Sequence, residues 1–60
     1  MHHEHAAKMS LAISKVAMLN ACVVSNHMTG DISKMHKNSR ELVEAEAELA
    51  DLLVEATKEQ

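Results

Sequence analysis

The chain contains no proline, and its only glycine, Gly30, lies at the midpoint of the 60 residues. Proline and glycine interrupt helices most strongly, so this distribution permits one break in an otherwise continuous helical pattern. Gly30 tolerates the left-handed conformation that ends a helix, and Asp31 is a favourable N-cap for the next one. The sequence therefore predicts one all-α domain with a helix over about 4–28, a turn at 29–31 and a second helix over about 32–58.

Such a short link between two long helices favours an antiparallel hairpin, in which facing residues have numbers that sum to about sixty. Apolar residues at three-four spacing would then form a coiled-coil-like seam. The predicted seam consists of Met9, Ile13, Val16, Val23, Met35, Leu42, Leu49 and Leu53. Asn20 would face Ser39 in a small polar layer, or it would turn to the surface.

The apolar surface of the two helices is larger than one seam can bury. The first helix also carries Leu11, Met18 and Cys22 on another side, beside a stripe of small residues: Ser10, Ser14, Ala17, Ala21 and Ser25. The second helix has a further strip at Val43, Ala47, Ala50 and Val54. A helix that is apolar on two sides is usually buried on two sides. We therefore expect the hairpin to assemble into a four-helix bundle or a larger helical oligomer.

The size and composition of the chain favour the same interpretation. A chain of 60 residues buries a modest core, and small domains usually need a disulfide, a metal or a partner. Aromatic residues are absent, and the single cysteine, Cys22, excludes an internal disulfide. Assembly with a copy or a partner is then the expected source of stability.

Charge is distributed unevenly along the chain. Residues 1–40 carry a net charge of +3, whereas residues 41–60 carry −6. The second helix is thus basic at its start and acidic towards its end, the reverse of what the helix dipole favours. Antiparallel pairing with a second copy would place basic starts beside acidic ends. We expect the homo-oligomer to be antiparallel for this reason.

A cluster of basic residues around the turn is one candidate site for an anion or a partner. It consists of His27, Lys34, His36, Lys37 and Arg40. A helix N-terminus attracts anions, but no glycine-rich phosphate loop is present. The alternative is a set of ordinary solvated basic residues.

An acidic strip is the second candidate, since five carboxylates recur at three-four spacing on one helix face: Glu41, Glu44, Glu48, Asp51 and Glu55. Such a strip is typical of a solvated outer face, and it could also bind a basic partner. The strip has no flanking aromatic or apolar anchor in the linear sequence.

The histidine-rich start, Met1-His2-His3-Glu4-His5, could chelate Cu(II) or Ni(II) through the amine and His3, or be a purification remnant or a frayed helix start. Cys22, His27 and His36 lack the paired spacing of a structural zinc site. We therefore expect neither a metal site nor a cofactor.

Several functional classes are disfavoured. A two-helix hairpin offers no concave pocket for catalysis, so we expect no enzyme. A net charge of −3 and the absence of aromatic residues disfavour nucleic-acid binding. The apolar run from Met9 to Val24 contains polar residues and is shorter than a membrane span, so we expect a soluble cytoplasmic protein.

The leading hypothesis is a small oligomeric interaction protein, an adaptor or inhibitor that binds another macromolecule, with a protein as the expected partner. The alternative is an oligomer that binds or sequesters an anionic small molecule, such as a nucleotide, at the basic turn. A third possibility is a structural subunit whose helices complete a larger partner.

Overall fold

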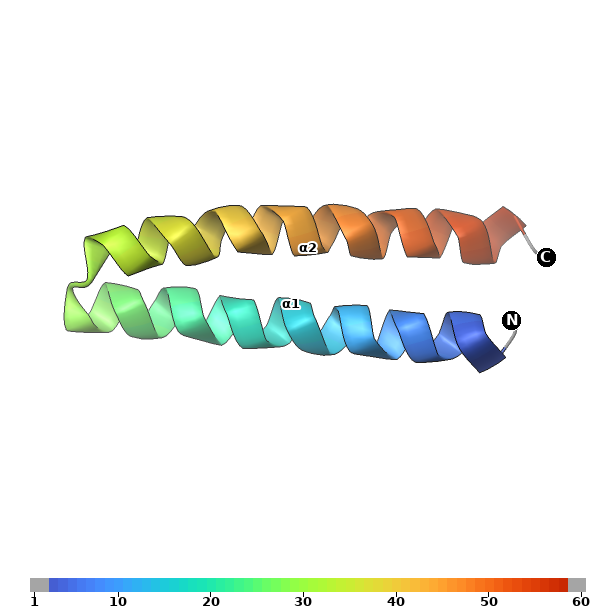
Figure 1. Ribbon diagram of the computed structural model, residues 1–60, viewed down its shortest axis with the longest axis horizontal. Helices are drawn as coiled ribbons and strands as arrows, with labels where there is room; N and C mark the ends of the chain where they lie inside the picture. The colour runs from blue at the N-terminus through green and yellow to red at the C-terminus, as the bar shows by residue number, and fades with distance from the viewer. Residues whose placement is uncertain (1–2, 59–60) are drawn as a thin grey trace.

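The computed structural model describes residues 3–58 and consists of two antiparallel helices, α1 (His3–Thr29) and α2 (Ile32–Lys58) (Figure 1). The Cα trace measures 45 × 15 × 11 Å, and the two ends of the chain lie at the same end of this rod. We call that end the open end and the opposite one the turn end. The prediction of an all-helical hairpin is confirmed.

The turn at Gly30 closes α1 with a Schellman motif. The Gly30 N–H donates to the His27 carbonyl at 3.2 Å, and the Asp31 N–H donates to the Asn26 carbonyl at 2.9 Å. This pair of hydrogen bonds satisfies carbonyls that the end of a helix otherwise leaves free. Gly30 has a φ of 79°, in the left-handed region that favours glycine. The glycine is therefore required by the backbone geometry of the turn.

Asp31 starts α2 as its N-cap. Its Oδ1 accepts the Lys34 backbone N–H at 3.1 Å, and its carbonyl accepts the Met35 N–H at 3.0 Å. Its Oδ2 lies 3.8 Å from the Lys34 Nζ. The carboxylate therefore accepts a hydrogen bond from a free backbone N–H at the helix start, and its negative charge partly offsets the positive charge of the first turn.

Substitution of Gly30 by alanine is expected to lower the free energy of unfolding by about 1 kcal/mol, because an L-residue is strained at this positive φ. No atom lies within 4 Å of an added Cβ, so the backbone alone accounts for the effect. Urea denaturation followed by circular dichroism measures the change. Gly30→Asn serves as the control, since asparagine tolerates this conformation better, and it should lose less stability than Gly30→Ala.

Each helix contributes one row of residues, at three-four spacing, to the contact between α1 and α2. The two rows together form the seam of the hairpin. The seam residues, all buried or half-buried, are His5, Met9, Ala12, Val16, Leu19, Val23 and Asn26 on α1, and Met35, Asn38, Leu42, Ala45, Leu49, Leu52 and Ala56 on α2. Each row repeats every seven residues, as in a coiled coil.

The enclosed core is small. Among the described hydrophobic residues, only Ala12, Leu19 and Ala45 are buried, at 6%, 5% and 3% exposure, and no large side chain is fully enclosed. Two of these three are alanines, whose small size suits a close approach of two helices. One hairpin therefore removes little apolar surface from water.

Two residues of the predicted seam lie outside it. Ile13 and Leu53 are 52% and 49% exposed, whereas Ala12 and Leu52 occupy the adjacent seam positions. Placing Ile13 and Leu53 between α1 and α2 was therefore wrong. Their contact with a second subunit stays a prediction.

The polar layer of the seam also differs from the expected one. Asn20 is exposed and Ser39 is half-buried, in agreement with the alternative that Asn20 turns to the surface. The layer is formed nearer the turn, where the Asn26 Nδ2 donates to the Asn38 Oδ1 at 2.6 Å. A polar pair at such a position fixes the register of a coiled coil.

Candidate interaction surfaces

The seam divides the hairpin into two flanking faces. When an antiparallel pair is viewed from one end, the two right-handed helices turn in opposite senses. Residues that directly follow the seam residues on α1 and on α2 therefore lie on the same side of the hairpin. Residues that directly precede the seam residues lie together on the opposite side.

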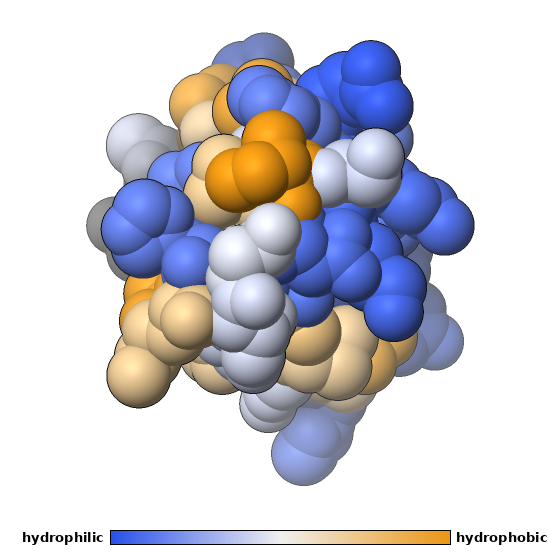
Figure 2. Space-filling view, turned by 90° about the vertical axis from the view of Figure 1, so that its left-hand side faces the viewer, coloured by the Kyte–Doolittle hydropathy of each residue, from blue (hydrophilic) through white to orange (hydrophobic). Residues whose placement is uncertain are grey.

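The side that follows the seam is nearly free of formal charge, and we call it the apolar face. Its members are Ala6, Ser10, Ile13, Ala17, Asn20, Val24, His27, His36, Ser39, Val43, Glu46, Ala50, Leu53 and Thr57. All are exposed except Ser39, which is half-buried. Glu46 is the one Asp, Glu, Lys or Arg among them. Seen from the turn end, blue dominates the right-hand side, whereas strong orange lies at the upper centre and upper left and paler orange at the lower left and bottom (Figure 2).

The side that precedes the seam, which we call the charged face, has the opposite composition. Its members are Glu4, Lys8, Leu11, Lys15, Met18, Cys22, Ser25, Lys34, Lys37, Glu41, Glu44, Glu48, Asp51 and Glu55. On α2 every one of these residues carries a charge. The charged face is therefore favourable in contact with water or a polar partner, whereas the apolar face is favourable when it is buried.

The acidic strip lies on the charged face, and its five carboxylates are all exposed: Glu41, Glu44, Glu48, Asp51 and Glu55. The hairpin brings Leu11 and Met18 of α1 to this same face, exposed at 72% and 59%. The linear sequence gave no sign of these apolar neighbours, because they come from the other helix.

The basic cluster at the turn end is not gathered into one pocket. All five residues are exposed, but Lys34 and Lys37 lie on the charged face and His27 and His36 on the apolar face. Arg40 lies between the two faces, on the outer side of α2. The Asp31 carboxylate already occupies the Lys34 backbone N–H that an anion would use. The geometry thus gives little support to a dedicated anion site.

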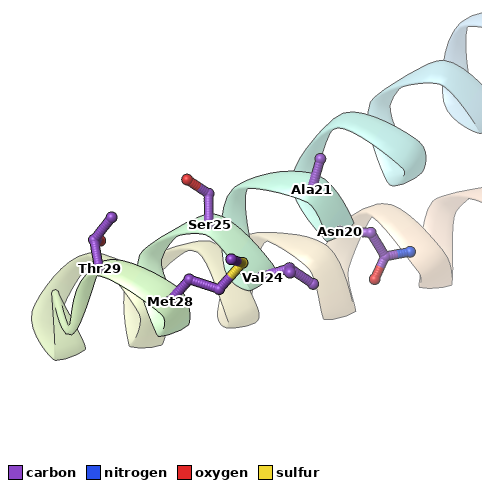
Figure 3. A pocket seen from close by; sticks show the side chains of 6 residues that line it. All are labelled: Asn20, Ala21, Val24, Ser25, Met28 and Thr29. Carbon is purple, nitrogen blue, oxygen red and sulfur yellow. The ribbon is translucent and has the colours of Figure 1, made fainter.

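Two shallow depressions lie on α1 alone. The first, about 550 Å³ in volume, is open to solvent and lined by Asn20, Ala21, Val24, Ser25, Met28 and Thr29 (Figure 3). The second, about 360 Å³, is lined by Leu11, Ser14, Lys15 and Met18. Both are bordered mainly by small and apolar side chains, without a convergent set of acids and bases. They are hollows in an exposed helix surface rather than enclosed ligand sites.

α1 is long and apolar enough, by length and composition alone, to cross a membrane. The soluble, cytoplasmic location expected from the run Met9 to Val24 stays a prediction. Only 11% of the most apolar window of α1 is buried within the hairpin. The core helix of a soluble protein and a signal sequence near the N-terminus meet the same criterion. The finding therefore adds to the description of α1 as a helix with uncovered apolar surface.

His5 closes the open end of the hairpin and was not singled out as a seam residue. It is 8% exposed, and its Nε2 lies 2.8 Å from the Leu52 carbonyl oxygen, to which the ring N–H donates. Its Nδ1 lies 3.8 Å from the Glu55 Oε2. The signal in the sequence is the seven-residue repeat His5, Ala12, Leu19, Asn26.

Substitution of His5 by alanine is expected to destabilise the hairpin by about 1 kcal/mol, because it removes the hydrogen bond to Leu52 and packing at the open end. His3→Ala is the matched control, since His3 is exposed and two residues away. Equal loss of stability in the two variants, measured by urea denaturation, would contradict the role assigned to His5.

Within residues 3–58, no group of three or more His, Cys, Asp or Glu side chains is placed to hold a metal ion. Cys22 is a free, half-buried thiol. Met1 and His2, part of the possible Cu(II) or Ni(II) chelate, lie outside the described residues. The expectation that the chain has no metal site therefore stays a prediction.

Comparisons with protein-family models, with curated proteins and with solved structures found no match.

Proposed function

We propose that the chain is a non-enzymatic interaction protein that assembles with its own copies into an antiparallel helical bundle and binds another protein. The observation that carries the proposal is the division of the hairpin into an apolar and a charged face around a very small core. Such a hairpin gains stability mainly by covering the apolar face. The charged face then remains available to a partner.

The charged face favours a basic, partly apolar protein segment as the partner. The acidic strip supplies complementary charge, which steers association and selects orientation. Leu11 and Met18 supply exposed apolar contact area beside it, and methionine is enriched at protein interfaces. A basic amphipathic helix combines both features.

Native mass spectrometry of the untagged protein, purified gently from cells, tests this function. We expect a multiple of the 6.6 kDa chain that carries a second protein. Leu11→Glu should release the second protein and keep the multiple, whereas Ala7→Glu, at an exposed position outside both faces, should keep both.

Two results would contradict the proposal. A stable monomer of 6.6 kDa with no bound protein would remove both parts of it. An added mass of a few hundred daltons, lost in Lys34→Glu and Arg40→Glu variants, would instead support the alternative of an anionic small molecule at the basic turn.

A further inference from the structure

We infer that the apolar face is the surface on which a second copy of this chain docks, face to face, to form a four-helix bundle. This inference rests on the proposed function and deepens it by assigning the self-assembly surface. It also gives Ile13 and Leu53, which lie outside the hairpin seam, a place between subunits.

The solvent-accessible area of the hairpin exceeds that of a typical monomer of the same mass. The difference is close to the area that one partner buries in a protein–protein interface. The accessible surface is 4618 Å² for a chain of 6.6 kDa. A compact monomer of this mass is expected to expose about 3,900 Å². The excess, about 700 Å², is close to the roughly 800 Å² that each partner buries in a standard interface. One dimer contact would therefore bring the exposed area to the usual range.

The distribution of charge selects the apolar face for this contact. Ten of the fourteen residues on the charged face are Asp, Glu, Lys or Arg, against one of fourteen on the apolar face. Burying the charged face against its copy would desolvate many charges without matched partners. Burying the apolar face would desolvate a single carboxylate per chain, that of Glu46.

The distribution of charge along the hairpin sets the orientation of the second copy. Lys34, Lys37 and Arg40 lie at the turn end, whereas Glu48, Asp51 and Glu55 lie towards the open end. These side chains lie on the charged face or on the outer side of α2, so face-to-face docking leaves them outside the contact. Turns at opposite ends keep the two basic ends apart and the two acidic ends apart, whereas turns at the same end would bring like charges together. A two-fold axis relates the copies, so the same face serves both subunits.

This arrangement places the two Glu46 side chains near each other, because Glu46 lies at the midpoint of α2 and the midpoints coincide in antiparallel stacking. Glu46→Leu should therefore tighten the dimer, by about tenfold or more in Kd, because it removes like-charge repulsion and a buried carboxylate. Glu44→Leu is the matched control, two residues away on the charged face, and should leave Kd within about twofold. Sedimentation velocity over a concentration series measures both.

A second matched pair tests the loss of the contact. Ile13→Glu places a carboxylate on the apolar face and should weaken dimerisation by about a hundredfold or more. Leu11→Glu makes a similar change on the charged face of the same helix and should keep the dimer. Circular dichroism at high protein concentration monitors the folding of each variant. Glu46→Leu needs no such check, because its expected effect is a gain of affinity.

Several results would overturn the inference. If Leu11→Glu and Glu44→Leu change the Kd while Ile13→Glu and Glu46→Leu do not, the chain assembles through its charged face. Self-assembly, the first part of the proposed function, then survives, whereas the partner surface assigned to the charged face does not. If the wild type is monomeric in every measurement, both fail. If it floats with phosphatidylcholine–phosphatidylglycerol vesicles and Ile13→Glu does not, the apolar face meets lipid instead of a second copy.

Discussion

Leu19→Asp is expected to abolish the hairpin. Leu19 is 5% exposed and is the one large aliphatic side chain among the buried residues described. Loss of the leucine side chain alone costs about 2–5 kcal/mol, and an unpaired carboxylate at a buried site adds to this loss. A chain of this length has a total stability of only about 3–9 kcal/mol. The variant should therefore lose its cooperative thermal transition and most of its helical circular dichroism.

The control for this change is Val54→Asp, which introduces the same carboxylate at an apolar position that is 53% exposed and lies outside both faces. It should alter stability by about 1 kcal/mol or less, as surface substitutions do. If Leu19→Asp retains a cooperative transition near that of Val54→Asp, the seam described between α1 and α2 is not the core of the protein in solution.

Dilution is the second condition with a large expected effect. If assembly and folding are coupled, each tenfold dilution lowers the free energy of unfolding by about 1.4 kcal/mol of dimer. Unfolding entropy is about 2.1 cal/mol/K per residue, so the roughly 120 residues of a dimer give a Tm decrease of about 5 °C per tenfold dilution. A hundredfold dilution of the wild type should therefore lower the Tm by about 10 °C.

Thermal denaturation followed by circular dichroism in cells of different path length measures this shift. Ile13→Glu provides the comparison, because a dimer weakened by about a hundredfold should unfold about 10 °C below the wild type at each concentration, the same shift as a hundredfold dilution. A wild-type Tm that stays constant over the hundredfold range would show that the hairpin is stable without self-assembly, despite its small core.

The positions of the two helices and of the turn between them follow from local features of the sequence. Gly30 and Asp31 end one helix and start the next, and no proline interrupts either segment. These signals act within a few residues of each other, so they can be recognised without knowledge of the rest of the fold. The same holds for the acidic strip, whose three-four spacing lies within a single helix.

The assignment of faces was decided only by the tertiary structure. α1 has apolar or small residues on several sides, so its pattern alone is compatible with either Ala12 or Ile13 in the seam. Packing against α2 selects Ala12 and Ala45, because small side chains let the two helices approach closely, and it leaves Ile13 and Leu53 exposed.

Three features depend on the rotation and register of one helix against the other. They are the polar pair Asn26–Asn38, the hydrogen bond from His5 to Leu52, and the position of Leu11 beside the acidic strip. The sequence by itself thus determined two helices and one turn. Their mutual packing decided which sides remain uncovered, because the burial of a side chain depends on its neighbours in space.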